Sequence, residues 1–206
     1  MIEIVEAAFT TSAPNVKLAP ENEYQDEIVF MARSNVGKSS LLNAITNRKG
    51  LAKVSSTPGK TRLINYFDAT FLDRENGEKR YAKLVDLPGF GYAKVSKSIK
   101  SDWEKNLTDY IAARRQIKLF IHLIDARHPD LDIDHSVANY LDQVVSEGQV
   151  ILRVFTKIDK LNQKEQNALR KLYPGSLMIS NTKKRGISKL VSIMHSIVFE
   201  RENFED

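Results

Sequence analysis

The stretch "EIVFMARSNVGKSSLLNAI", residues 27–45, constrains the fold of this chain more than any other. An apolar run ends at Ala32, and a segment with helical periodicity starts just after Gly37. This strand–loop–helix order is the setting of a phosphate-binding loop. Backbone N–H groups at the helix start can surround a β-phosphate, while Lys38 can reach the β- and γ-phosphates and Ser39 can offer its hydroxyl to Mg²⁺. The stretch predicts a mononucleotide site where the strand ends.

The first position of this loop departs from the usual pattern G-x-x-x-x-G-K-[ST], because Ala32 stands where the pattern has glycine. If the strand continues through this position, a methyl group is tolerated there. A positive φ would instead cost an alanine about 1–2 kcal/mol. We favour an extended backbone at Ala32, because the rest of the loop is intact.

The remainder of the chain alternates short apolar runs with amphipathic stretches. The runs are "EIVFMA", "KLFIHLID", "VILRVF" and "SLMIS", and the helical stretches lie near 38–47, 98–113, 134–147, 162–172 and 187–200. This alternation predicts an α/β fold in three layers, in which a mostly parallel sheet carries helices on both faces.

The segment "RENGEK" interrupts the alternation, and its Asn76-Gly77 pair indicates a tight hairpin between two strands. One antiparallel strand is therefore expected at the sheet edge. We expect residues 1–26 to form a strand and an extended arm, 27–200 the nucleotide-binding domain, and 201–206 a charged tail.

Two further motifs follow the first in a fixed order. "KLVDLPGFGY" ends an apolar run at Asp86, whose carboxylate can reach a magnesium shell through water, and the N–H of Gly89 can contact a γ-phosphate. "VFTKIDKL" ends a later run, so Asp159 can accept hydrogen bonds from N1–H and N2–H₂ of guanine while the stem of Lys157 covers the base. Adenine has no matching donors, so the motifs favour GTP over ATP.

Two weaker signals complete the predicted site. "MISNTKKRG" places Ser180 and Asn181 where a backbone N–H could meet guanine O6. "VSSTPGKTRLINYF" is typical of a mobile switch loop, and either Thr57 or Thr61 could complete the magnesium shell.

Together these motifs resemble the EngB (YihA/YsxC) family of bacterial ribosome-biogenesis GTPases, within the TrmE-Era-EngA-like group, and the resemblance implies a three-layer P-loop GTPase (Ras-like) domain. The residues that carry the resemblance are "SAPNVKLAP", "RSNVGKSSLLN", "STPGKTRLINYF", "VDLPGFGYAKV", "DARHPDLDID", "TKIDKL" and "SNTKKRGISKL". They extend from about residue 9 to residue 195, nearly the whole chain. The family pattern has glycine at position 32, so Ala32 departs from it.

The resemblance implies Ser39 and Thr61 as the magnesium ligands, preferring Thr61 to Thr57. The nucleotide-binding residues expected from the motifs and the resemblance are Ala32, Arg33, Ser34, Asn35, Val36, Gly37, Lys38, Ser39, Ser40, Gly59, Lys60, Thr61, Arg62, Leu63, Asp86, Leu87, Pro88, Gly89, Thr156, Lys157, Ile158, Asp159, Ile179, Ser180 and Asn181.

The expected catalytic residues are Lys38, Asn35 and Gly89. Phe90 stands where many GTPases have a glutamine that orients water, so hydrolysis should be slow. Asn35 occupies the position at which related GTPases help to hold a monovalent cation, so potassium is a possible second cofactor and, like the ribosome, a possible activator. We expect GTP to order residues 51–63 and 89–96 into a surface that a partner reads.

The resemblance identifies this partner as the large ribosomal subunit or its precursor, with a role in normal cell growth, septation and division. Lys and Arg outnumber Asp and Glu by 31 to 26, which is compatible with a polyanionic partner. The candidate contacts to RNA phosphates are Arg48, Lys49, Arg114, Arg115, Lys183, Lys184 and Arg185.

The composition also indicates a location. The chain has no cysteine, which fits a reducing compartment, and it shows neither a basic leader nor an apolar run of roughly 18 residues. We expect a cytoplasmic monomer that does not bind membranes. Two alternatives remain open: a P-loop kinase of a small molecule, which gives Asp159 no role, and a non-hydrolysing ribosome-docking module that has lost nucleotide binding through Ala32.

Overall fold

The computed structural model describes residues 1–21, 25–52, 63–90, 105 and 107–200. Within these residues, seven strands form one sheet in the order β1-β3-β4-β2-β5-β6-β7. The strands are β1 (Ile2–Ala13), β2 (Asp26–Ala32), β3 (Ile64–Asp73), β4 (Lys79–Asp86), β5 (Ile117–Asp125), β6 (Val150–Thr156) and β7 (Leu177–Met178). The labelled α-helices are α1 (Lys38–Ile45), α3 (Asp132–Val144), α4 (Gln163–Leu172) and α5 (Ile187–His195).

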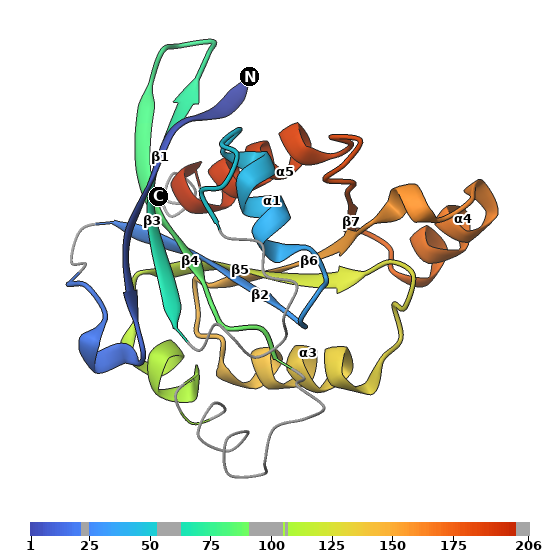
Figure 1. The fold of residues 1–206 in the computed structure, drawn as a ribbon, viewed down its shortest axis with the longest axis horizontal. Coiled ribbons are helices and arrows are strands. Elements are labelled where there is room, and N and C mark those ends of the chain that lie inside the picture. Colours follow the sequence, from blue (N-terminus) through green and yellow to red (C-terminus); the bar gives the residue numbers. More distant parts are fainter. Residues whose placement is uncertain (22–24, 53–62, 91–104, 106, 201–206) are drawn as a thin grey trace.

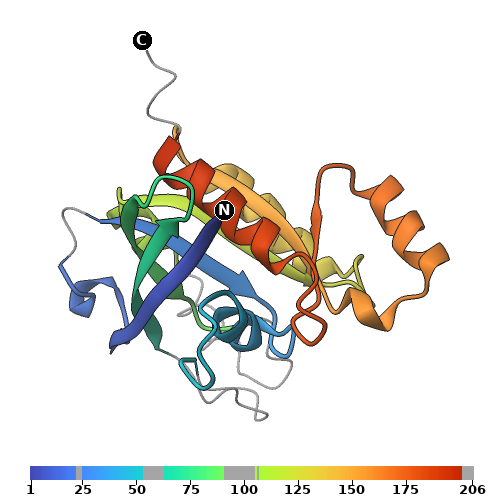
Figure 2. The same cartoon turned by 90° about the horizontal axis from the view of Figure 1, so that it is seen from above.

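Helices cover both faces of the sheet, as the alternation predicted. Figure 1 shows α1 and α5 on one side of the central strands and α3 on the other, together with the helical segment at 107–113. Figure 2 shows α4 beyond the end of the sheet that is remote from β1. The three-layer α/β fold is therefore confirmed.

Strand β2 shows why the two layers form, because it is apolar on both faces. Ile28 and Phe30 pack with α1 and α5, whereas Val29 and Met31 pack with α3 and the segment 107–113. All four side chains are fully buried. A continuous apolar run is what a central parallel strand requires when helices lie on both sides.

The predicted antiparallel strand is β3, which joins β4 through a hairpin. Gly77 has φ 76°, and the side chain of Asn76 accepts a hydrogen bond from the N–H of Glu78 at 2.9 Å. Strand β1 pairs antiparallel with β3 and lies outside it, so the edge itself is β1. The N-terminal strand is thereby an integral part of the sheet.

Local signals account for the helix boundaries. Helix α4 begins with a capping box, in which the Asn162 side chain accepts from the N–H of Glu165 at 3.0 Å and the Glu165 carboxylate accepts from the N–H of Asn162 at 2.7 Å. Helix α5 starts after Gly186, whose φ is 73°. A Cβ at this glycine would lie 2.7 Å from the carbonyl oxygen of Met178, so no other residue fits without a backbone shift.

One candidate RNA contact is wrong. Arg114 is buried, and its guanidinium pairs with the buried carboxylate of Glu27 and donates to the carbonyl of Pro20 at 3.0 Å. It fastens the N-terminal arm to the domain and lies close to the rings of Tyr66 and Tyr110. The residue was misassigned because charge alone does not reveal which arginines lie beside a buried acid.

In the described part of the chain, no helix has the length and apolarity needed to cross a membrane. The predicted charged tail at 201–206, and residues 98–104 and 106 of the helix predicted at 98–113, lie outside the described residues.

Candidate functional site

The predicted phosphate loop connects β2 to α1 at the carboxyl edge of the sheet. Gly37 precedes the first residue of α1 and has φ 107°, and Asn35 has φ 66°. Both values lie in the left-handed region, which only glycine adopts freely and asparagine tolerates better than most residues. The loop thus turns through two left-handed residues, Asn35 and Gly37, before α1 begins, and left-handed residues of this kind occur in backbone nests that bind anions.

Ala32 is the last residue of β2 and is fully buried. Its φ is not among the positive values found in the described residues, which decides between the two geometries considered from the sequence. The Ala32 carbonyl accepts a hydrogen bond from the N–H of Phe90 at 3.1 Å. A position with extended backbone and apolar surroundings does not require glycine, so the methyl group of Ala32 is accommodated.

Lys38 and Asp86 lie together at the expected phosphate end. The ammonium of Lys38 pairs with the carboxylate of Asp86 and also donates to the carbonyl of Leu87 at 2.6 Å. The two charged side chains are only 12% and 8% exposed. Asn65 donates to the second oxygen of Asp86 at 3.4 Å. The first two sequence motifs are therefore in direct contact.

The segment after Asp86 is joined to the phosphate loop by backbone hydrogen bonds. The N–H of Ser34 donates to the carbonyl of Phe90 at 3.3 Å, so Phe90 pairs with both sides of Arg33. A Cβ at Gly89 would lie 3.2 Å from the Ser34 hydroxyl, which itself has no hydrogen-bond partner among the described residues. Gly89 thus packs closely on the loop that is expected to hold phosphates.

The third and fourth motifs meet beside the same loop. The Thr156 hydroxyl donates to the carbonyl of Val36 at 2.8 Å, and the Lys157 ammonium donates to the carbonyl of Asn35 at 2.5 Å. The Ser180 hydroxyl donates to the carboxylate of Asp159 at 2.6 Å. This bond holds the pKa of Asp159 below its usual value, against the opposing effect of burial. Asp159 is therefore ionised at neutral pH.

Asn181 provides another link between distant segments. Its side-chain amide donates to the carbonyl of Gly37 at 3.1 Å, while its oxygen is buried without a hydrogen-bond partner in the described part of the chain. The sequence suggested a backbone role for this residue, and the structure adds a side-chain contact with the phosphate loop.

The other predicted residues divide by their position. Ser39 and Ser40 lie in the first turn of α1, with partly exposed side chains, and Pro88 lies between Leu87 and Gly89. The side chains of Val36, Leu87, Ile158 and Ile179 are buried in the core, so only their backbones can face a ligand. Leu63 is 39% exposed, whereas Gly59, Lys60, Thr61 and Arg62, with Thr57, lie outside the described residues.

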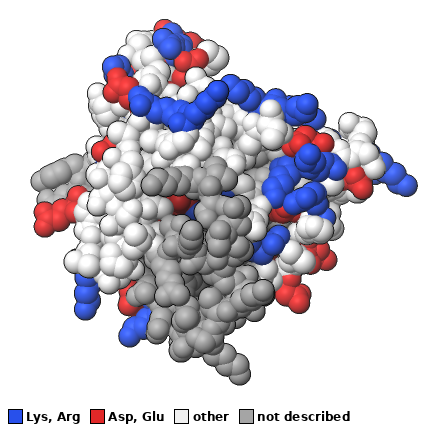
Figure 3. Space-filling view, viewed as in Figure 1, with Lys and Arg blue, Asp and Glu red and all other residues white. Residues whose placement is uncertain are grey.

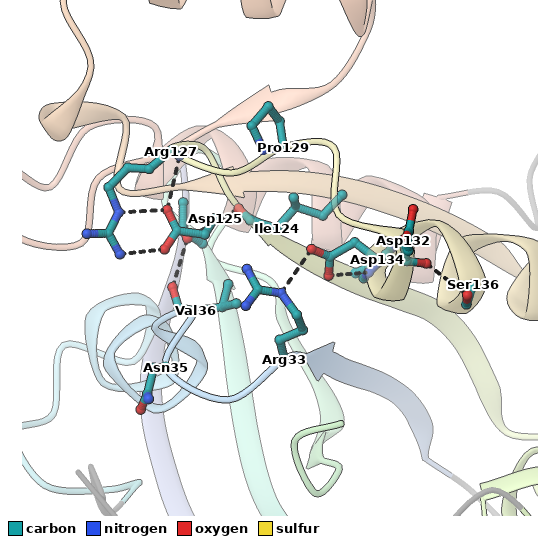
Figure 4. Close-up of polar contacts among 12 residues, drawn as sticks. Arg33, Asn35, Val36, Ile124, Asp125, Arg127, Pro129, Asp132, Asp134 and Ser136 are labelled. Carbon is teal, nitrogen blue, oxygen red and sulfur yellow. Dashed lines mark hydrogen bonds and ion pairs between the residues drawn. The ribbon is translucent and has the colours of Figure 1, made fainter. Parts of the chain in front are cut away.

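Two acidic residues that the sequence analysis did not select also contact the loops. Asp125 ends β5 and binds Arg127 and Lys157, and Asp134 in α3 accepts a hydrogen bond from Arg33 at 3.0 Å. Figure 4 shows Arg127 folded over Asp125, and Arg33 extending to Asp134. The side chain of Arg33 is thus directed to α3. Asp125 could have been noticed, since it ends an apolar run at the carboxyl edge where open α/β sheets bind ligands.

The arrangement as a whole suits a nucleotide. One end of the site carries a left-handed loop, a lysine and a helix start, and the other carries an ionised carboxylate fixed by a serine hydroxyl. Within the described residues no three His, Cys, Asp or Glu side chains gather as a metal cluster. A divalent ion would therefore need ligands such as hydroxyls, phosphates and water.

Comparison with protein families gives a direct match. The model of a family described as "50S ribosome-binding GTPase" matches residues 27–157. The chain is 52% identical over 188 residues to a probable GTP-binding protein EngB of Aliarcobacter butzleri, covering 91% of this chain and 94% of that protein. It is 49% identical over 191 residues to the protein of the same name from Wolinella succinogenes, covering 92% and 94%.

Solved structures share the fold. A crystal structure of a probable GTP-binding protein EngB superposes with a TM-score of 0.62 at 21% identity, covering 84% of this chain and 99% of the other. A structure of Era in complex with MgGDPNP and part of the 16S ribosomal RNA gives 0.59 at 19% identity, covering 84% of this chain and 57% of Era.

Proposed function

The chain belongs to the EngB family of GTP-binding proteins, and we propose that it is a slow GTPase that acts as a nucleotide-dependent switch in assembly of the large ribosomal subunit. GTP binding and a GTPase domain follow from the family. The speed of hydrolysis, the metal, the partner and a role in cell growth and division are parts of the proposal, as is a cytoplasmic location.

The observation that best supports the proposal is the convergence of four separate loops at one edge of the sheet. Lys157 and Thr156 contact the phosphate loop, and Asp159 is oriented by Ser180 two elements later. An oriented carboxylate can accept the two hydrogen bonds that N1–H and N2–H₂ of guanine offer. Adenine would leave this carboxylate unpaired, which explains a preference for guanine.

A magnesium ion fits the residues at the phosphate end. The Ser39 hydroxyl and the Asp86 carboxylate supply hard oxygen donors, and Asp86 is held at the mouth of the phosphate loop by Lys38. Thr61 would complete the set but lies outside the described residues. When bound, the ion would neutralise charge on the phosphate oxygens. Lys38 would then hold the β- and γ-phosphates, and the N–H of Gly89 would face the γ-phosphate.

Slow hydrolysis is proposed because of Phe90. Its side chain is buried, and its ring lies 6.0 Å from that of His122, centroid to centroid, so it points into the core. An apolar side chain cannot orient water. Asn35 is exposed at the loop apex, where its side chain is available to a monovalent cation. Potassium should raise the hydrolysis rate more than sodium, and equal rates in the two salts, or an unchanged ratio in Asn35→Ala, would remove this part of the proposal.

A ribosomal partner is supported by the family description and by the Era structure with ribosomal RNA. Figure 3 shows lysine and arginine side chains spread across the upper part of one face, near α1 and α5. The candidate residues that remain exposed are Arg48, Lys49, Arg115, Lys183, Lys184 and Arg185. Subunit binding measured over a salt titration should show a steep negative slope if these residues neutralise RNA phosphates. A flat slope would exclude them as RNA contacts.

The decisive experiment is a titration with a fluorescent GDP analogue, competed with unlabelled GTP and ATP. We expect binding at micromolar or lower concentration, displacement by GTP, and no displacement by equal ATP. The extended backbone at Ala32 argues against loss of nucleotide binding at that position. Absence of binding would support a docking module instead, and equal competition by ATP would favour a small-molecule kinase.

A further inference from the structure

Asp125 lies at the centre of a polar cluster that joins three loops. It is the last residue of β5, and its side chain is only 5% exposed. One carboxylate oxygen accepts from the backbone N–H and Nε of Arg127, at 3.1 and 3.0 Å. The other accepts from Nη2 of Arg127 at 2.7 Å and from Nζ of Lys157 at 3.0 Å. Four hydrogen bonds therefore converge on one buried carboxylate.

Lys157, which belongs to this cluster, has an unusual backbone conformation and a fixed side chain. Its φ is 59°, a left-handed value that residues with a Cβ rarely adopt. Its ammonium has two protein partners, the Asp125 carboxylate and the carbonyl of Asn35 in the phosphate loop. Both partners lie at the far end of the side chain. They fix the direction of its four-carbon stem, which would otherwise sample many rotamers.

Opposite charges stabilise the contact between Asp125 and Lys157. Burial opposes ionisation of Asp125, but the hydrogen bonds from Arg127 and Lys157 outweigh it and hold the pKa of this carboxyl well below its usual range. Arg127 is 43% exposed, so it covers the carboxylate from the solvent side. Figure 4 shows Asp125 between Arg127 and the loop that carries Asn35 and Val36. The carboxylate is thus a fixed negative charge behind the base-binding loop.

We propose that Asp125 is a positioning residue for the nucleotide: by holding Nζ of Lys157 against the phosphate loop, it sets the lysine stem where it covers the guanine base. The inference rests on the proposed nucleotide site and assigns the carboxylate no contact with the ligand. Its effect passes through Lys157, so it concerns every purine nucleotide equally. Discrimination between bases belongs to Asp159, which Ser180 orients independently.

A double-mutant cycle tests this pathway. GDP dissociation constants are measured by fluorescence for the wild-type chain, Asp125→Asn, Lys157→Met and the double variant. Asp125→Asn preserves shape but removes the charge, and we expect it to weaken GDP binding about tenfold. Because both residues act through one contact, the double variant should bind GDP no more weakly than Lys157→Met alone. Asp125→Asn should also weaken IDP and GDP by the same factor, so their ratio stays as in the wild type.

The chain supplies a matched control in the β3–β4 hairpin. Asp68 pairs with Lys83 at 2.6 Å and is remote from the loops, so Asp68→Asn makes the same chemical change without altering GDP affinity. Thermal unfolding without nucleotide shows how far each variant is destabilised. The inference would be overturned if the double variant lost GDP affinity by the product of the two single losses, or if Asp125→Asn changed the ratio of GDP to IDP affinity. The proposed function would stand in either case. A wild-type chain that binds no guanine nucleotide would remove both.

Discussion

The two ends of the candidate site are held in different ways. At the base end, Asp159 and Lys157 are each bound to a residue of another loop, Ser180 and Asp125. These partners leave the carboxylate of Asp159 ionised and the stem of Lys157 fixed. At the phosphate end, by contrast, Lys38 is bound to Asp86, so two groups expected to serve the nucleotide and its metal are bound to each other.

This difference assigns separate tasks to the two ends. Because Asp159 and Lys157 already have fixed partners, the proposed guanine site would bind its base without a large conformational cost. The phosphate end must exchange partners, because a phosphate that takes the Lys38 ammonium competes with Asp86 and with the carbonyl of Leu87. Both of these groups precede Gly89 in the same segment. In the proposed complex, phosphate binding would therefore be coupled to the segment of Gly89.

The largest effect is expected from Asp159→Asn, which tests whether the base end alone selects the base. The introduced amide N–H₂ would donate where the carboxylate accepts. It would therefore face the N2 amino group of guanine, which is also a donor, and no hydrogen bond could form. Xanthine has an oxygen at that position. The ratio of GDP to XDP affinity should fall on the order of 1,000-fold in competition titrations. A ratio within tenfold of the wild type would mean that Asp159 does not read the base.

A smaller effect is expected from Lys38→Met, which acts at the other end. It removes the charge that would bind phosphates and leaves Asp86 without its charged partner. Affinity for GDP and GTP should fall on the order of 100-fold, measured by the same titration. The ratio of GDP to XDP affinity should not change, because Asp159 is untouched. A change in this ratio would show that the two ends are not separate.

Gly89→Ala tests the sensing segment and should have a smaller effect again. The new methyl would lie 3.2 Å from the Ser34 hydroxyl and 3.5 Å from the Ala32 carbonyl, so the segment must shift by a few tenths of an ångström. We expect the rate constant for hydrolysis of bound GTP to fall about tenfold while the GDP dissociation constant changes less than about twofold. Single-turnover hydrolysis and GDP titration measure the two quantities. Equal losses in both would place Gly89 outside the γ-phosphate region.

The sequence was sufficient for the fold because its signals were local and mutually consistent. Apolar runs on both faces of β2, the Asn76-Gly77 turn and the Gly37 helix start each predicted an element that the structure contains. The pairing of β1 outside β3 was not predicted, because partner choice between strands depends on contacts more than 50 residues apart along the chain. The prediction that Arg114 contacts RNA was wrong for the same reason, since its partner Glu27 is distant in sequence.

For the site, the sequence indicated which loops take part but not which side chains bind one another. Asp159 could be selected from its motif, whereas the bond from Ser180 that orients it depends on how two loops pack. Asp125 was missed because an acidic residue at a strand end is usually part of a solvated turn, and Asp134 because an acidic residue in the first turn of a helix usually only complements the helix dipole. Only the burial of both carboxylates, with arginines directed at them, reveals a structural role.

Ala32→Gly should have the smallest effect on GDP affinity. It tests the last residue of β2, which leads directly into the phosphate loop. The Ala32 carbonyl is fixed by the N–H of Phe90, and its methyl is buried in the core of β2. If only the Lys38–Asp86 pair and the segment near Gly89 exchange partners, the backbone at 32 stays in place. Restoring the family glycine should therefore leave GDP affinity within about twofold, while the free energy of unfolding falls by about 1 kcal/mol through the lost methyl and the more flexible backbone. Chemical denaturation and GDP titration measure these two quantities. A gain of tenfold or more in GDP affinity would show instead that the Ala32 methyl group obstructs the phosphates. The phosphate site would then include Ala32 itself, the last residue of β2.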